Sequence, residues 1–227
     1  MDKQTLKESY LRVVNRINEL SGFRKVTLLL ATKTQCAEDI NYLINEGCSY
    51  IGENRVNELL EKYESYDKRA ELHFIGTLQS NKVKYIIDKV DLIHSVDTVT
   101  LLEEINKRAA KINKIQNILI EINSGKEENK GGVMPEDAVA FYKKAMEYAN
   151  IKVCGLMTMA PRCETREEYL HYFGITKKLF DELFENDENA ILSMGMSESY
   201  EYAIEAGANL VRVGSLVFGK RNYDERK

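Results

Sequence analysis

The sequence has 227 residues, of which 44% are hydrophobic and 30% charged, a composition typical of soluble globular proteins and not of disordered ones. Its formal net charge is −4 and its basic residues are interspersed with acids, which argues against nucleic-acid binding. No apolar run approaches the length of a membrane span, and the polar N-terminus does not resemble a signal peptide, so we expect a cytoplasmic protein without a membrane partner.

The cysteines contain no CxxC pair and have no histidine at zinc spacing. They are Cys36, Cys48, Cys154 and Cys163. We therefore expect reduced thiols and no metal site. No linker, repeat or low-complexity tract divides the chain, so residues 1–227 are expected to form one domain, which we expect to be monomeric.

The first predicted element is an amphipathic helix over residues 3–20, in which Leu6, Tyr10, Val13 and Ile17 recur at spacings of three and four residues. After it, short apolar segments alternate with helical patterns. The expected strands are residues 26–32, 50–51, 72–76, 90–94, 117–122, 151–157, 190–193 and 209–213. The expected helices lie at residues 37–46 and 56–63, after the polar turn at 77–82, after a cap at Asp97 or Thr98, from Pro135 onward, at 166–184, and between 197 and 207.

Strands that alternate with helices form parallel βα units, and eight such units can close into a barrel with the helices outside. The predicted fold is therefore α/β, a single (β/α)8 TIM barrel with an extra N-terminal helix. An open, doubly wound sheet is the alternative, which is disfavoured because no GxGxxG turn follows the first strand.

Lys33 ends the first predicted strand, whose nearly continuous apolar run is typical of a parallel strand buried on both faces. In α/β barrels, ligands bind at the carboxyl ends of the strands. A lysine there can attack a carbonyl as a neutral amine and form a Schiff base. A solvated lysine at a strand end is the alternative.

Two late segments end their strands in glycine and serine: residues 193–197 follow the seventh strand, and Gly214-Ser215 follow the eighth. Glycine lets a backbone approach a ligand, serine donates a hydroxyl, and the start of a helix offers N–H groups, so the pair favours a phosphate site. The alternative is two tight turns with Ser197 as a helix N-cap. In a closed barrel the eighth strand pairs with the first, which would make Gly214 and Lys33 neighbours.

A phosphate beside a nucleophilic lysine describes a phosphorylated aldehyde, either a sugar phosphate in a lysine aldolase or pyridoxal 5′-phosphate (PLP). Arg212 lies two residues before Gly214, so both point to the same side of the strand. Its guanidinium is a donor and never an acceptor, and could face a pyridine nitrogen and keep it unprotonated. A surface salt bridge is the alternative for Arg212.

Taken together, these motifs resemble the YggS/PROSC family of PLP-binding proteins, often called PLP homeostasis proteins, over essentially the whole chain. The resemblance depends on residues 31–34 (ATKT), 52–58 (GENRVNE), 73–82 (HFIGTLQSNK), 129–132 (NKGG), 155–158 (GLMT), 192–197 (LSMGMS) and 211–215 (VRVGS). The family is similar in fold to the barrel domain of alanine racemase. One departure is Thr32, which stands where the family often has serine and preserves the hydroxyl.

The resemblance implies that Lys33 carries PLP as an internal aldimine and that Arg212 faces the pyridine nitrogen. Ser197, Gly214 and Ser215 would hold the phosphate, and Asn54 would lie near the ring. His73 is interpreted only as a polar residue at a strand end.

The resemblance further implies a protein that buffers PLP or delivers it to PLP-requiring apoenzymes, and that affects amino-acid and keto-acid balance without efficient amino-acid turnover. The alternative is a PLP-dependent amino-acid racemase. A racemase needs a base on each face of its substrate, and none of the 13 tyrosines sits in a motif that identifies it as the second base.

Overall fold

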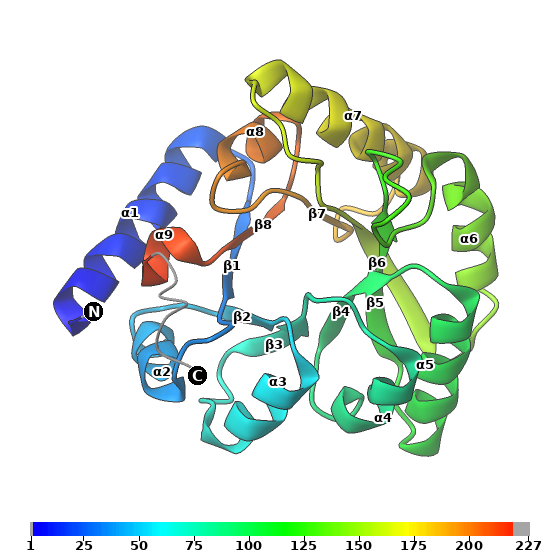
Figure 1. Ribbon diagram of the computed structural model, residues 1–227, viewed down its shortest axis with the longest axis horizontal. Coiled ribbons are helices and arrows are strands. Elements are labelled where there is room, and N and C mark those ends of the chain that lie inside the picture. The colour runs from blue at the N-terminus through cyan, green and yellow to red at the C-terminus, as the bar shows by residue number, and fades with distance from the viewer. Residues whose placement is uncertain (1, 220–227) are drawn as a thin grey trace.

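The computed structural model describes residues 2–219, and in it eight parallel strands close into a barrel (Figure 1). The strands follow one another around the barrel in chain order, and β8 pairs with β1, for example Val213 with Leu30. The strands are β1 (Thr27–Ala31), β2 (Tyr50–Glu53), β3 (Glu71–Phe74), β4 (Leu92–Val96), β5 (Gln116–Ile122), β6 (Ile151–Thr158), β7 (Ile191–Ser193) and β8 (Leu210–Val213). Closure confirms the predicted barrel and excludes the open sheet; the predicted domain range, 1–227, extends past the described residues at both ends.

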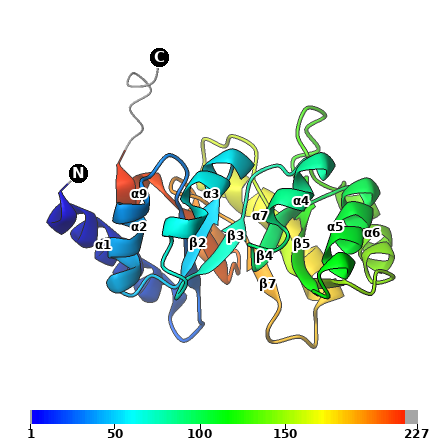
Figure 2. The same ribbon diagram turned by 90° about the horizontal axis from the view of Figure 1, so that it is seen from below.

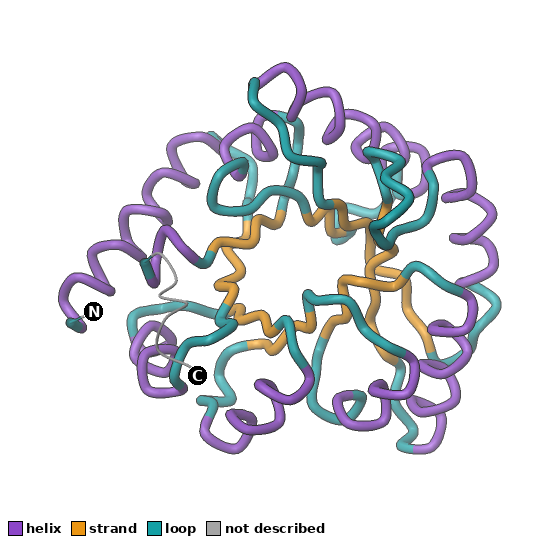
Figure 3. Tube along the Cα trace, in the orientation of Figure 1, coloured by secondary structure: helices purple, strands orange, loops and turns teal. Residues whose placement is uncertain are grey.

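The helices form a ring outside the strands, as Figure 3 shows. They are α1 (Lys3–Ser21), α2 (Ala37–Asn45), α3 (Val56–Lys62), α4 (Val83–Ile86), α5 (Val99–Lys111), α6 (Ala138–Ala145), α7 (Arg166–Leu183), α8 (Tyr200–Glu205) and α9 (Ser215–Phe218), with short 3-10 turns η1 (Tyr63–Ser65), η2 (Ser80–Lys82) and η3 (Pro135–Asp137). The extra helix α1 buries the predicted stripe and packs on α2, α8 and α9. Figure 2 shows it beside α2 and α9, and Figure 1 shows it on the side of the barrel where β8 meets β1.

Three details of the sequence prediction change. The helix expected after residues 77–82 is only four residues long, because the chain turns at Lys89 and Val90 toward β4. The cap of α5 is Thr98, whose hydroxyl accepts from the Leu101 N–H, whereas Asp97 accepts from the Gly132 N–H. The short helix α9, directly after the second glycine–serine turn, was not predicted as an element.

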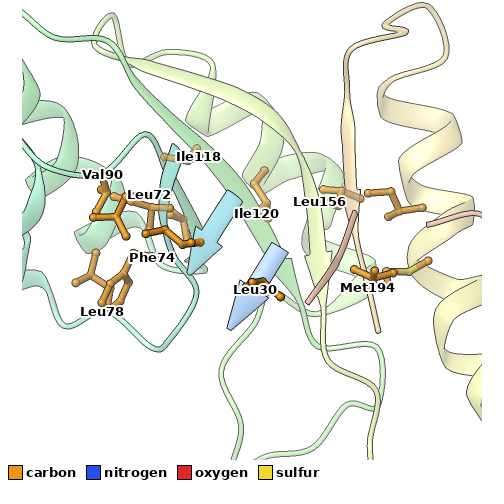
Figure 4. Close-up of a cluster of buried hydrophobic side chains, with 14 of the residues drawn as sticks. Leu30, Leu72, Phe74, Leu78, Val90, Ile118, Ile120, Leu156 and Met194 are labelled. Carbon is orange, nitrogen blue, oxygen red and sulfur yellow. The ribbon is translucent and has the colours of Figure 1, made fainter. Parts of the chain in front are cut away.

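The barrel has two apolar layers because successive side chains of a strand point to opposite faces. The larger layer lies between the strands and the helices, and Figure 4 shows part of it, with Leu30, Phe74, Ile120 and Leu156. The inner layer is smaller and consists of two clusters of side chains. They are Leu29, Ile75 and Leu210, and Leu92, Leu119 and Met157. The inner layer forms the floor on which the site at the strand ends is built.

Candidate functional site

A cavity of about 470 Å³ opens at the carboxyl ends of the strands. It is lined by residues from the ends of β1, β2 and β8, from the loops after β6 and β7, and from α7. All the site residues predicted from the sequence line it: Lys33, Asn54, Ser197, Arg212, Gly214 and Ser215. The structure therefore brings the predicted residues together in one place, which is the arrangement a single small ligand requires.

The backbone on both sides of Lys33 is held by carboxylates. The Thr32 hydroxyl donates to Glu53 Oε1 over 2.7 Å. On the other side Thr34 has a φ of 67°, a conformation rare for a β-branched residue, and its N–H donates to Glu58 Oε2 over 2.7 Å. Because both neighbours are fixed, the half-buried Lys33 is directed into the cavity and is not a freely solvated lysine at a strand end.

Glu53, the last residue of β2, is the centre of a buried polar cluster on the outer face of the barrel. Besides the Thr32 hydroxyl, its Oε1 accepts from Lys62 Nζ and from the Tyr66 hydroxyl, each over 2.5 Å. Lys62 also donates to the carbonyl oxygens of Thr32 and Gln35. Burial and the Glu53 charge raise the pKa of Tyr66, which therefore stays a hydrogen-bond donor. The cluster attaches the Lys33 segment to α3 and to the turn after it.

Arg212 is buried inside the barrel, so the surface salt bridge considered for it is wrong. Its Nη1 donates to the carbonyl and hydroxyl oxygens of Ser193, over 3.0 and 2.6 Å, and its Nη2 donates to the Thr158 carbonyl over 3.1 Å. Burial lowers the pKa of Arg212 to about 10, and the charge of Glu121 opposes that shift. The guanidinium therefore remains protonated at neutral pH and is held in orientation by the ends of β6 and β7.

The two glycine–serine turns lie against each other. The Ser197 hydroxyl accepts from the Gly214 N–H over 3.3 Å, and the first turn is tied to β8 by the Arg212 N–H, which donates to the Gly195 carbonyl over 3.1 Å. Ser197 is not the N-cap of α8, because Ser199 holds that position. The hydroxyls and N–H groups of both turns therefore gather at one wall of the cavity.

Glycine is required in both turns. Gly195 has a φ of 83°, and a Cβ there would lie 2.5 Å from the Ala203 Cβ. A Cβ on Gly214 would lie 2.9 Å from the Ala31 carbonyl oxygen, at the seam between β8 and β1. The glycines therefore let the chain approach β1, and that close approach is what places the second turn near Lys33.

Asn54 contributes an acceptor to the cavity. Its Oδ1 is buried and, within the part of the chain that the structure describes, has no hydrogen-bond partner. A buried polar atom without a partner is costly, so an acceptor left in this state at a cavity wall suits a ligand that donates a hydrogen bond.

Part of the cavity wall was missed by the sequence reasoning. It comes from the loop after β6 and from the first turns of α7: Met159, Ala160, Pro161, Arg162, Tyr169 and Phe173. The only available signal was the general rule that βα loops surround a barrel site. That rule identifies the loop but does not say which of its side chains face inward.

The described residues contain no cluster of metal-ligating side chains and no disulfide. Within residues 2–219, no three histidine, cysteine, aspartate or glutamate side chains gather as a metal site would require, and all four cysteines are free thiols. In the same range, no helix combines the length and apolarity needed to cross a membrane.

A family model described as "Alanine racemase, N-terminal domain" matches residues 3–222. The pyridoxal phosphate homeostasis protein of Aquifex aeolicus is 47% identical over 224 residues, covering 95% of this chain and 98% of that protein. The protein of the same name from Helicobacter pylori is 38% identical over 197 residues, 85% of this chain and 87% of its own.

Among solved structures, PipY of Synechococcus elongatus with PLP bound superposes with a TM-score of 0.82 at 27% identity, covering 94% of this chain and all of PipY. Alanine racemase of Clostridium difficile has a TM-score of 0.80 at 18% identity, over 99% of this chain and 59% of the racemase, a likeness of fold alone. The chain therefore belongs to the family of pyridoxal phosphate homeostasis proteins, which is built on the alanine racemase N-terminal domain.

Proposed function

We propose that this chain binds PLP at the mouth of the barrel and acts in PLP homeostasis, as a protein that buffers the cofactor or delivers it to PLP-requiring apoenzymes. The observation that carries the proposal is the meeting of Lys33, Arg212 and the two glycine–serine turns in one cavity. The names of its relatives, and the PLP bound to PipY, support the same ligand.

The residues of the cavity fit this cofactor group by group. PLP has an aldehyde, a pyridine ring and a phosphate, and the cavity offers an amine, a buried guanidinium and a wall of hydroxyl and N–H donors. We assign Lys33 to the aldehyde, as the lysine that binds it covalently, and Arg212 to the ring nitrogen. The phosphate is assigned to Ser197, Gly214 and Ser215, and the neighbourhood of the ring to Asn54.

Arg212 supports a binding role over a catalytic one. Bound PLP supplies an electron-accepting ring, and its accepting power is greatest when the ring nitrogen is protonated. With a pKa of about 10, Arg212 offers only N–H donors at neutral pH. It can therefore hydrogen-bond an unprotonated nitrogen and disfavours a protonated one, which restrains carbanion chemistry.

The cavity also offers little to a two-base racemase. Tyr169 is the tyrosine that lines it in the described part of the chain, and its ring stacks on those of Phe173 and Tyr202. Burial raises the pKa of Tyr169, so the phenolate that a base requires is scarce at neutral pH. We infer that amino-acid turnover is inefficient and that the influence on amino-acid and keto-acid balance is indirect.

The test is the visible absorption spectrum of the purified protein after incubation with PLP, before and after borohydride reduction, with mass mapping of the modified lysine. The expected result is one PLP fixed to Lys33, lost in Lys33→Ala and retained in Lys126→Ala, which removes an exposed lysine. Modification elsewhere would contradict the assignment of Lys33. Racemisation of a panel of amino acids faster than about 1 s⁻¹, the low end of ordinary enzymes, would contradict the carrier role.

A further inference from the structure

A row of polar side chains crosses the interior of the barrel beneath the candidate site. His73, His94, Ser193 and Arg212 lie on β3, β4, β7 and β8, and none is more than 4% exposed. The side chains two positions away on these strands belong to the inner apolar clusters or pack against them: Ile75, Leu92, Ile191 and Leu210. Because side chains two positions apart on a strand point to the same face, all four residues of the row lie on the inner face of the barrel.

The row is continuous. His73 Nδ1 lies 3.0 Å from His94 Nε2, and His94 Nδ1 lies 3.2 Å from the Ser193 hydroxyl. That hydroxyl lies 2.6 Å from Nη1 of Arg212. Buried polar side chains are costly unless each is satisfied by a neighbour.

The row ends at two different cavities. Arg212 lines the candidate PLP site, whereas His73 lines a cavity of about 310 Å³ at the opposite end of the barrel, among residues that precede or begin the strands. His73 Nε2 is buried and lies 3.6 Å from a carboxylate oxygen of Glu71, without a hydrogen bond to any described residue. The interpretation of His73 as a simple strand-end residue is therefore incomplete.

Two directions are open to the row, because a hydroxyl can both donate and accept, and the Glu71 carboxylate beside His73 Nε2 favours the one in which His73 carries its hydrogen on that atom. Arg212 can only donate, so the Ser193 hydroxyl accepts from it, and the hydroxyl's own hydrogen is available for His94 Nδ1. His94 then carries its hydrogen on Nε2 and donates it to His73 Nδ1. His73 in turn carries its hydrogen on Nε2, directed toward the Glu71 carboxylate. In this state both histidines are neutral.

We propose that His73, His94 and Ser193 are positioning residues, which link a proton bound at the N-terminal end of the barrel to the hydrogen bonding of Arg212 at the cofactor end. The link to the cofactor rests on the function proposed above. The relay itself belongs to the protein alone and can be tested without PLP.

The uptake of one proton reverses the direction of the row. When His73 is protonated, both of its nitrogens donate, so His94 Nε2 must become an acceptor. His94 then carries its hydrogen on Nδ1 and donates to the Ser193 hydroxyl, which accepts from His94 and Arg212 together and whose own hydrogen no longer has His94 as its acceptor. The row holds one more hydrogen than before, taken from solvent, and the acceptor that Ser193 offers to Arg212 is now shared.

The charged surroundings differ at the two ends of the row. Burial, His73 and Arg212 lower the pKa of His94 well below its ordinary value, so His94 stays neutral. Glu71 on β3, whose pKa the neighbouring His73 lowers, supplies the nearby negative charge, and the Tyr50 ring packs on His73 edge-on from β2. The other charged groups on this cavity are Lys25, Asp91 and Glu188, and at the far end Glu121 faces Arg212.

The experiment is long-range ¹H–¹⁵N NMR of ¹⁵N-histidine-labelled protein without PLP, from pH 8 to pH 5. At pH 8 we expect the His94 hydrogen on Nε2, and in the state in which both His73 nitrogens carry a hydrogen we expect it on Nδ1, so the two His94 nitrogens exchange their ¹⁵N shifts. His171, which lies on α7 outside the barrel, is the internal control. In His73→Asn the amide oxygen can accept from His94 but cannot take up the proton, so His94 should keep its hydrogen on Nε2 throughout.

A His94 hydrogen on Nδ1 at pH 8, or a His94 tautomer that stays the same when both His73 nitrogens carry a hydrogen, would overturn the proposal. The wild-type titration decides this even where the variant fails to fold.

The link to the cofactor is tested with the PLP-loaded protein. Its visible spectrum should change with pH at the same midpoint as the His94 tautomer, and should lose that change in His73→Asn. A midpoint or spectrum unaffected by the variant would refute the link, whereas failure to bind PLP at all would refute the proposed function and leave the NMR result standing.

Discussion

Replacing Glu53 by glutamine should be among the most damaging single changes outside the cavity. The Glu53 side chain is fully buried, and its Oε1 accepts from Lys62, Tyr66 and Thr32. The Lys62 side chain is only 14% exposed, so it has little access to water if its counter-charge is removed. Glutamine keeps the shape of the side chain and one acceptor oxygen, removes the charge, and places an NH2 group where Oε2 stands, an atom without a hydrogen-bond partner among the described residues.

The expected loss in the free energy of unfolding is about 3–5 kcal/mol, the cost of leaving one member of a buried ion pair without its partner. Lys62 keeps two backbone carbonyl acceptors, which favours the lower end of that range. For a domain of this size, each kcal/mol lowers the melting temperature by about 2–4 °C, so the variant should melt roughly 6–20 °C below the wild type.

The assay is urea and thermal denaturation of the protein without ligand, with Glu147→Gln as the matched control. Glu147 pairs with Lys144 over 2.7 Å, but the side chains are 64% and 45% exposed, and such a pair contributes at most about 1 kcal/mol. Equal losses in the two variants would refute the view that the Glu53 cluster is a buried, structurally essential pair. Because Thr32 also loses its charged acceptor, PLP affinity should fall in Glu53→Gln and not in Glu147→Gln.

Three further predictions follow from other parts of the barrel. Ser197→Ala combined with Ser215→Ala should weaken PLP binding at least about 10-fold in an equilibrium titration while the protein stays folded, and unchanged affinity would exclude the phosphate site. Burial raises the pKa of Glu121 from 4.5 to about 7, so the native state binds a proton that the unfolded state releases, and stability falls as pH rises between these values. Between pH 4 and pH 8 the free energy of unfolding of Glu121→Gln, measured by urea denaturation, should therefore rise relative to that of the wild type by up to about 3 kcal/mol. A difference between the two proteins that does not depend on pH would contradict this. Gly155→Ala would place a Cβ 1.9 Å from a carbonyl oxygen of β7, and should cost clearly more stability than Gly47→Ala, where φ is also positive but no atom lies within 4 Å.

The fold was largely predictable because its signals are local. Each strand is a short apolar run followed by a helical pattern, and eight repeats leave a closed barrel as the simplest arrangement. The ends of strands were less predictable, as for β4, expected at 90–94 and found at Leu92–Val96. Pairing with neighbouring strands decides where a strand ends, and pairing is not a property of the local sequence.

The candidate site likewise has residues that the sequence could place and residues that it could not. Lys33, Arg212 and the glycine–serine turns could be placed because they lie at or directly after the carboxyl ends of strands, which all meet at one mouth. The Glu53 cluster could not, because its donor Tyr66 lies beyond a helix and a 3-10 turn whose packing no local pattern specifies. The contact between His73 and His94 depends on the register of β3 against β4, where His73 lies opposite Leu92, two residues before His94.

The amine of Lys33 and the guanidinium of Arg212 are fixed by separate means. The Lys33 segment is held on the outer side of the barrel, where Thr32 and Thr34 donate to the carboxylates of Glu53 and Glu58. Arg212 is held inside the barrel by acceptors on β6 and β7. The backbone pairing of β1 with β8 sets how far apart their segments lie, because it closes the barrel between them. The relative position of amine and guanidinium is therefore a property of the barrel itself, and the loop after β6 can vary the outer wall of the cavity without disturbing it.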